Sequence, residues 1–284
     1  MIPAAFDYVA PTTVDEAVRA LSEAGEDAKV IAGGQSLLPV LRMRLAAPSK
    51  LIDLGKIAEL RGVREDGDLL VIGAMTTHYD VQHDALIAEH APLLALTTNT
   101  VADPQVRHRG TFGGSLAHAD PAGDLPAPVL ALDAEMVVRG MDGTRTVPAA
   151  EFFTDFFTTA LRPGELLVEV RVPKTTGWSA HYEKFNRVAQ AWSIVAVAAA
   201  VRVDGGTIAQ ARVALTNMGA TPVRATSVEQ ALVGRPATAA SIRDAAAHAA
   251  EGTAPPSNAD ADADYRRHLA RVLTSRAVSA AVGA

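Results

Sequence analysis

The stretch Ala28-Lys29-Val30-Ile31-Ala32-Gly33-Gly34-Gln35-Ser36 decides the fold. A strand-forming run ends at Ile31 and meets two glycines, which are followed by an amide and a hydroxyl side chain. Glycine allows positive φ and a close approach of the backbone to a ligand, and successive N–H groups in such a turn form a concavity that binds anions. Ser36 can add a hydroxyl donor or cap a helix that starts at Leu37. A single glycine pair of this kind is more often an ordinary tight turn.

A second glycine pair, in Thr111-Phe112-Gly113-Gly114-Ser115, changes that interpretation. It lies in a stretch rich in Gly, Pro, Asp and His, 102–126, which we expect to be irregular and functional. Asp120 and Asp124 follow, and their carboxylates can accept hydrogen bonds from ribose or ribityl hydroxyls. Neither a G-x-G-x-x-G nor a G-x-x-x-x-G-K-[ST] motif is present. The two loops together therefore predict a dinucleotide whose pyrophosphate is gripped from two sides without a Rossmann fingerprint.

Hydrophobic periodicity predicts strands and helices arranged in two domains. Strands are expected at 6–9, 28–31, 51–54, 135–139, 166–172, 194–203 and 207–215, with a hairpin within 60–73. Helices are expected at 14–24, where Gly25 ends the first, and at 79–83, 92–100, 127–132, 223–233, 241–250 and 265–281. The turn-forming segment 173–177 marks a domain boundary, and 251–264 is expected to be a polar loop.

Composition limits the possible functions of the chain. It has 284 residues, of which 49% are hydrophobic, which suits two packed domains. Its net charge of −6 comes from interspersed acids and bases, which argues against nucleic-acid or anionic-membrane partners. The absence of cysteine excludes chain-borne iron–sulfur clusters, cysteine nucleophiles and attachment of a flavin through sulfur. The longest apolar run, 194–201, is too short to span a bilayer, so we expect a cytoplasmic protein.

Several ordered motifs along the whole chain resemble the FAD-binding subunits of molybdenum hydroxylases, most of all those of the carbon monoxide dehydrogenase type. The motifs are Ala32-Gly33-Gly34-Gln35-Ser36-Leu37-Leu38-Pro39, the run from Thr111 to Pro121, Phe156-Phe157-Thr158-Thr159-Ala160-Leu161, Tyr182-Glu183-Lys184-Phe185-Asn186-Arg187, Leu215-Thr216-Asn217-Met218-Gly219 and Tyr265-Arg266-Arg267-His268-Leu269-Ala270-Arg271. Similar proteins often have Ile and Asn where this chain has Phe112 and Ser115.

The resemblance implies an α+β fold and a set of cofactor-binding residues. Residues 1–175 would form a two-part FAD-binding domain of the vanillyl-alcohol-oxidase (PCMH) type, with subdomains 1–57 and 58–175. Residues 178–284 would form a C-terminal α+β domain with a small antiparallel sheet and helices. The residues implied to hold FAD non-covalently are Val30, Ile31, Ala32, Gly33, Gly34, Gln35, Ser36, Leu37, Val101, Ala102, Thr111, Gly113, Gly114, Ser115, Asp120, Asp124, Leu167 and Lys184.

The resemblance also implies partners. A large molybdopterin-binding subunit would oxidise the substrate, and a small [2Fe-2S] subunit would pass electrons to the FAD of this chain in a dimer of heterotrimers. The chain would need no catalytic or metal-ligating residue of its own. The acceptor is left open between a quinone, NAD and oxygen. The alternatives are a stand-alone flavoprotein oxidase and an assembly-only homologue without cofactor, although the intact glycine pairs argue against the latter.

Single residues carry further expectations. Lys184 is interpreted either as an exposed lysine at a strand end or as a charge near the flavin ring, and Trp192 is expected to pack in the core rather than over a ring face. The histidines at 78, 83, 90, 108 and 118 have no zinc spacing and are expected at the surface or as caps, with His118 near the cofactor. The alternating acids at 260, 262 and 264 lack the glycine and final acid of a calcium loop, which favours a helix cap.

Overall fold

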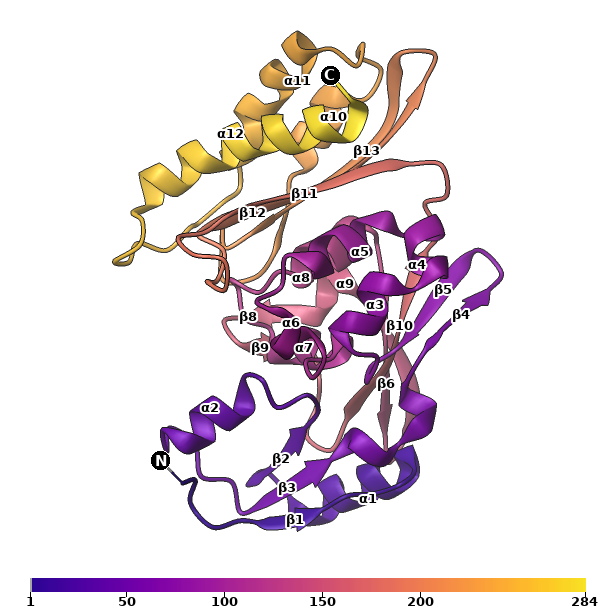
Figure 1. Ribbon diagram of the computed structural model, residues 1–284, viewed down its shortest axis with the longest axis vertical. Coiled ribbons are helices and arrows are strands. Elements are labelled where there is room, and N and C mark those ends of the chain that lie inside the picture. Colours follow the sequence, from indigo (N-terminus) through magenta and orange to yellow (C-terminus); the bar gives the residue numbers. More distant parts are fainter. Residues whose placement is uncertain (1) are drawn as a thin grey trace.

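The computed structural model describes residues 2–284. At the N-terminal end of the molecule lies a three-stranded parallel sheet (Figure 1). The strands are ordered β1 (Asp7–Val9), β3 (Lys50–Asp53) and β2 (Ala28–Ile31). Helix α1 (Val14–Ala24) begins where the Thr13 hydroxyl accepts a hydrogen bond from the Glu16 N–H, and it packs its apolar face against this sheet. Helix α2 (Leu37–Arg42) follows β2 directly through the first glycine loop, residues 32–36.

A five-stranded antiparallel sheet forms the middle of the molecule. Its order is β4 (Val63–Asp66), β5 (Leu69–Gly73), β10 (Leu166–Pro173), β6 (Glu135–Gly140) and β7 (Gly143–Pro148). Six short helices lie between β5 and β6 along the chain, and several of them pack on this sheet: α3 (His78–His83), α4 (Ala85–His90), α5 (Pro92–Asn99), α6 (Pro104–Arg107), α7 (Phe112–His118) and α8 (Pro126–Ala131). The expected hairpin is confirmed as β4–β5, which turns at Gly67.

The prediction that residues 102–126 are irregular is wrong in part. The stretch contains α6, which begins at Asp103, and α7, which begins at Thr111. In both helices the capping side chain accepts a hydrogen bond from a backbone N–H three residues on. These helices were not predicted because glycine and proline have low helix propensity. Proline is nevertheless compatible with the first turn of a helix, where Pro104 lies.

The C-terminal domain consists of an antiparallel sheet with helices on one face (Figure 1). The strands are ordered β11 (Ser179–Phe185), β12 (Val195–Asp204), β13 (Thr207–Thr216) and β14 (Val223–Arg224). The helices are α10 (Thr226–Leu232), α11 (Ala239–Ala246) and α12 (Ala263–Val282). The expected helix over 223–233 is therefore wrong at its start, where β14 pairs with β13. Strand β11 was not predicted, although its residues alternate between polar and apolar from Ser179 to Glu183.

Strand β12 explains the longest apolar run of the sequence. Val195, Val197 and Val201 pack against the C-terminal helices, whereas Ala196 and Ala198 belong to the core of the middle domain. Both faces of the strand are buried, so its residues do not alternate between apolar and polar. In the described part of the chain, 2–284, no helix is long and apolar enough to cross a membrane.

Two smaller segments complete the middle domain. Helix α9 (Ala149–Phe152) leads into a two-stranded hairpin of β8 (Phe153–Asp155) and β9 (Thr158–Thr159).

The expected cap before the last helix is confirmed, because the Asp262 carboxylate accepts a hydrogen bond from the Tyr265 N–H at 2.7 Å.

Candidate cofactor site

The first glycine loop contains four successive backbone N–H groups that have no partner within the described residues. Gly34 has a φ of +74°, which favours glycine. A Cβ atom added at Gly33 would overlap the carbonyl oxygen of Arg109 and lie 2.7 Å from Gly110 Cα. Within residues 2–284, the backbone N–H groups of Gly33, Gly34, Gln35 and Ser36 have no hydrogen-bond acceptor. Ser36 stands at the start of α2 without a side-chain capping bond, so its hydroxyl is also free to bind a ligand. This is the backbone arrangement that holds anions.

The second glycine loop, residues 111–115, differs from the sequence expectation. Its N–H groups are already bonded within the protein: Gly113 to Ala74 O at 2.9 Å, and Gly114 to the Thr111 hydroxyl at 3.2 Å. Neither glycine has positive φ. A Cβ atom at Gly113 would lie 2.5 Å from Ala74 Cβ, so glycine here allows α7 to approach β5 closely. Among the described residues, the donors of this loop without an acceptor are the half-buried Ser115 hydroxyl and, at the buried Thr111, the N–H and the hydroxyl.

The two glycine loops lie against each other. Gly33 packs on the backbone of Arg109 and Gly110, immediately before the second loop. A Cβ atom at Gly114 would lie 3.2 Å from the Ala32 Cβ. Residues 76 to 82 positions apart in the chain are therefore in contact, and the first loop lies beside the second. Unpaired backbone donors of this kind can bind a phosphate group.

Asp124 is a buried carboxylate that joins the two domains. Its Oδ1 accepts hydrogen bonds from the Tyr182 hydroxyl and the Ser193 hydroxyl, both at 2.9 Å. Its Oδ2 accepts a hydrogen bond from Lys184 Nζ at 2.8 Å. A carboxylate offers about four acceptor positions, so about one is left for a cofactor hydroxyl. In this structure Asp124 forms an ion pair with Lys184, and the sequence did not indicate this pair.

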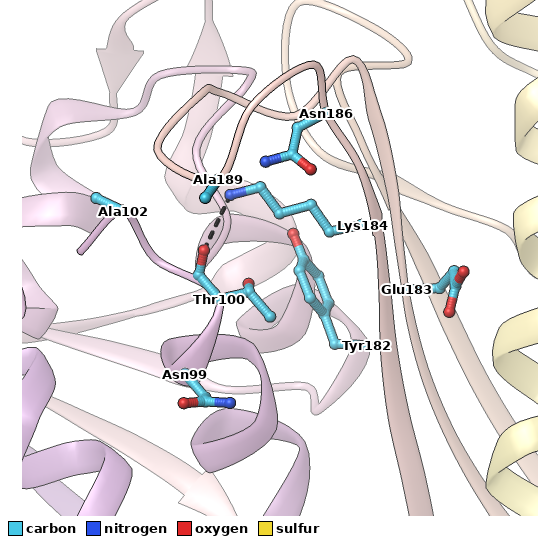
Figure 2. Close-up of a pocket in the computed structure, with 8 residues that line it drawn as sticks. All are labelled: Asn99, Thr100, Ala102, Tyr182, Glu183, Lys184, Asn186 and Ala189. Atoms are coloured by element: carbon cyan, nitrogen blue, oxygen red, sulfur yellow. Dashed lines mark hydrogen bonds between the residues drawn. The ribbon is translucent and has the colours of Figure 1, made fainter. Parts of the chain in front are cut away.

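Lys184 lies at the wall of a cavity of about 450 Å³ between α5 and β11 (Figure 2). Its side chain is only 7% exposed, so the interpretation as an exposed lysine is wrong. Its Nζ also donates to the carbonyl oxygen of Thr100 at 3.1 Å. The cavity has the volume of a typical ligand pocket and is further lined by Asn99, Ala102, Asn186 and Ala189.

The turn at Val101 and Ala102 carries backbone strain beside this cavity. Ala102 has a φ of +42°, which a non-glycine residue rarely adopts. The turn is held by Arg107, whose guanidinium donates to Val101 O at 2.9 Å. Ala102 lines the cavity, and the position of both residues beside a bound ring stays a prediction. Leu167, by contrast, is almost fully buried in β10 next to the bulge at Glu169, in the hydrophobic core of the middle domain.

Trp192 is in a different environment from the one expected. It is 58% exposed, so the prediction of core packing is wrong. It belongs to the loop between β11 and β12, which also supplies Asn186 and Ala189 to the cavity. Gln190 of this loop donates to the Asp103 carboxylate at 2.6 Å and so connects the loop to the start of α6.

Burial shifts the pKa of several groups around the second loop. Burial, and then the charge of Asp124, raise the pKa of Tyr182 well above its usual value, so Tyr182 stays a proton donor to Asp124. Burial raises the pKa of Asp120 and lowers that of His118. His78 is buried against Gly110, which contradicts the expected surface position, and burial with the nearby Arg107 lowers its pKa to about 4.

The residues that sequence reasoning missed are Tyr182, Ser193 and Arg107. One signal for Tyr182 was available, because residues two apart on a strand face the same side. Had β11 been recognised, Tyr182 would have been placed beside Lys184. The bonds of Ser193 and Arg107 depend on loop conformations that have no sequence pattern.

Comparisons with known proteins identify the family of the chain. Residues 4–175 match the model of the FAD binding domain in molybdopterin dehydrogenase, and residues 180–281 match that of the CO dehydrogenase flavoprotein C-terminal domain. The carbon monoxide dehydrogenase medium chain of Hydrogenophaga pseudoflava is 42% identical over 99% of this chain and 98% of its own length.

Solved structures superpose over the whole chain. A reconstituted CO dehydrogenase from Oligotropha carboxidovorans has a TM-score of 0.97 at 39% identity, covering 100% of this chain and 99% of that chain. Quinoline 2-oxidoreductase from Pseudomonas putida 86 has a TM-score of 0.95 at 35% identity, with the same coverage. The chain therefore belongs to the family of FAD-binding medium subunits of molybdenum hydroxylases, the family of the carbon monoxide dehydrogenase medium chains.

Proposed function

We propose that this chain holds FAD across the joined surface of the two glycine loops and transfers electrons from a partner [2Fe-2S] subunit to an external acceptor. The observation that carries the proposal is the set of four free N–H groups at residues 33–36, next to the second loop. When bound, FAD supplies a centre that takes up single electrons and releases one or two. The protein supplies binding, orientation and charge.

The pyrophosphate end is assigned mainly to the first loop. The N–H groups of Gly33, Gly34, Gln35 and Ser36 would donate to the phosphate oxygens, and the hydroxyls of Ser36 and Ser115 would add two donors. The other residues of 30–37 would line the pyrophosphate end of the site. Thr111, Gly113 and Gly114 would fix the position of α7 against the first loop. Asp120 and the one free acceptor position of Asp124 would take sugar-like hydroxyls.

The ring end is assigned to the cavity beside Lys184. Its ammonium is held by Asp124 and by the Thr100 carbonyl, so the charge keeps a fixed position. A lysine there would favour a reduced ring that carries negative charge. Val101 and Ala102 would lie beside the ring, and Leu167 would shape the site from the core side. Trp192 is exposed on the adjoining loop and is free to cover a ring face.

The assembly is proposed from the family. We expect a cytoplasmic dimer of heterotrimers with a large molybdopterin-binding subunit and a small [2Fe-2S] subunit, a PCMH-type fold for the FAD domain, and the carbon monoxide dehydrogenase type of complex. Domain boundaries at 175 and 178 also stay predictions.

Two measurements test this function. The isolated chain, mixed with FAD and desalted, should retain about one flavin per chain with flavin absorbance bands. The native complex should contain molybdenum and iron, and its flavin should be reduced by substrate only when the partner chains are present. A chain without flavin bands contradicts FAD binding. Flavin reduction by a small substrate in the isolated chain supports the stand-alone oxidase instead.

A further inference from the structure

Two polar side chains of the C-terminal domain hold the backbone immediately before β12. Asn217 and Arg266 belong to the last two motifs along the chain that resemble this family, and both are buried. The Asn217 Nδ2 donates to the carbonyl oxygen of Ser193 at 2.8 Å. The Arg266 guanidinium donates to the carbonyl oxygen of Ile194. Two motifs far apart in the sequence therefore meet at two successive carbonyl groups.

Arg266 is a cation in the core whose hydrogen bonds go to neutral oxygen atoms. Besides Ile194, it donates to the side-chain oxygen of Asn258 at 3.0 Å, and its Nε has no acceptor within residues 2–284. Burial lowers the pKa of Arg266, and the nearby Asp260 carboxylate opposes this effect. Burying a charge that is not bonded to a carboxylate is unfavourable. An arginine at this place therefore favours a role beyond filling the core.

Asn217 is connected to both ends of one buried hydrogen bond. Its φ is +62°, a conformation that asparagine tolerates better than most residues. Its backbone N–H donates to the carbonyl oxygen of Pro121 at 2.9 Å, shortly before Asp124 in the middle domain. Its side chain holds Ser193, whose hydroxyl donates to Asp124 Oδ1 at 2.9 Å. Asn217 thus fixes the backbone on the donor side and on the acceptor side of the Ser193–Asp124 bond.

The Ser193–Asp124 bond in turn affects the position of the Lys184 ammonium. Asp124 Oδ1 accepts from the hydroxyls of Ser193 and Tyr182, which directs Oδ2 to Lys184 Nζ at 2.8 Å. Tyr182 and Lys184 extend from the same side of β11 and line the cavity (Figure 2). The terminal torsion of an aspartate is soft, so a carboxylate that loses one of two orienting donors can turn. The ammonium would then lose its fixed place beside the cavity.

We propose that Asn217 and Arg266 are positioning residues that act on Asp124. They hold Ser193, which orients the Asp124 carboxylate, and this carboxylate keeps the Lys184 ammonium beside the cavity. The fixed ammonium raises the reduction potential of a flavin bound there, because a charge already in place needs no reorganisation when the ring takes up electrons. This inference rests on the proposed function, since it requires a flavin in that cavity.

The test measures the reduction potential of FAD in the native complex by redox titration, together with FAD content per chain. Ser193→Ala removes the hydroxyl donor. Asn217→Gly removes the side-chain donor, keeps the backbone N–H and tolerates positive φ. Ile242→Ala is the matched control, because it opens a cavity in the core of the same domain at α11 and its apolar side chain cannot bond to Ser193.

We expect Ser193→Ala and Asn217→Gly each to lower the potential at wild-type FAD content. The expected size is a tenfold shift of the two-electron equilibrium, about 30 mV. The double variant should lower the potential no further than Ser193→Ala alone, because Asn217 acts through that hydroxyl. Arg266→Met should resemble Asn217→Gly, and Arg266→Lys should recover part of the loss. The control should keep the wild-type potential.

Other outcomes overturn the proposal. Additive losses in the double variant would show that Asn217 acts by another route, and an unchanged potential in Asn217→Gly would remove it from the network. An equal shift in Ile242→Ala would reduce the effect to one of stability. If the Arg266 variants do not fold, the cycle of Ser193 and Asn217 still decides. A wild-type complex without FAD on this chain would instead contradict the proposed function.

Discussion

The two glycine loops have similar sequences and different structural roles. In the first loop the N–H groups of Gly33 and Gly34 are free, and one glycine has positive φ. In the second, the N–H groups of Gly113 and Gly114 are bonded inside the protein, and both glycines serve close packing of a helix. The comparison shows that the first pair both leaves backbone donors unpaired and, at Gly33, allows close packing, whereas the second pair serves packing alone. Contacts, rather than the motif, distinguish the two.

The largest expected effect is on FAD binding at the first loop. Gly33→Val places a branched side chain against the backbone of Arg109 and separates the two loops. We expect FAD affinity to fall by more than about 100-fold and the melting temperature to fall as well, because the backbone of Arg109 and Gly110 has to move. Flavin absorbance after desalting and fluorescence titration measure this. Stoichiometric FAD in the variant would refute the site.

The next effect concerns the ion pair between Lys184 and Asp124, at the end of the site assigned to the flavin ring, to which neither glycine loop contributes. Lys184→Met leaves the buried Asp124 carboxylate without its cation and should lower the free energy of unfolding by about 3–5 kcal/mol. The double variant Lys184→Met/Asp124→Asn should recover much of this loss. Urea denaturation of the chain without FAD provides the measurement. Equal stability of the single and double variants would show that the pair is not coupled.

The free energy of unfolding should depend on pH through His78, which packs against Gly110 just before the second loop. Its pKa of about 4 lies below its ordinary 6.5, so between these values the unfolded chain binds a proton that the folded chain excludes. The stability is fully present above pH 6.5 and is lost as pH falls towards 4, by about 3 kcal/mol. Denaturation at several pH values should show this loss in the wild type and a smaller slope in His78→Gln. Identical slopes would exclude His78.

Gly113→Ala tests the packing role of the second loop. The added Cβ atom meets Ala74 and should lower the free energy of unfolding by about 1–3 kcal/mol. FAD affinity, measured well below the unfolding temperature, should change less than in Gly33→Val. A variant that loses FAD at unchanged stability would give the second loop the same role as the first.

The smallest effects are expected from the two hydroxyls. Ser36→Ala and Ser115→Ala each remove one donor and should weaken FAD binding by about 0.5–1.5 kcal/mol. Isothermal titration compares the two variants directly. An effect above this range at Ser115 would indicate that the second loop donates to the phosphates more than its bonded N–H groups allow.

Much of the fold followed from periodicity, and the failures have identifiable causes. Helix α1 and the β4–β5 hairpin were predictable, because a capping threonine and an Asp-Gly-Asp turn are local signals. Helices α6 and α7 were missed, because glycine and proline have low helix propensity and tertiary packing overrode it. Strand β11 was missed, because its alternation of polar and apolar residues runs only from Ser179 to Glu183 and is broken at Lys184.

The sequence by itself determined that two glycine loops, two later carboxylates and no cysteine belong to this chain, and these residues suit FAD with clusters carried elsewhere. Only the tertiary structure decided which loop offers free donors, that Lys184 is buried against Asp124, and that Trp192 and the Phe156–Phe157 pair are exposed. The physical reason is that hydrogen-bond satisfaction and burial depend on residues far apart in the chain, whereas caps, turns and periodicity depend on neighbours.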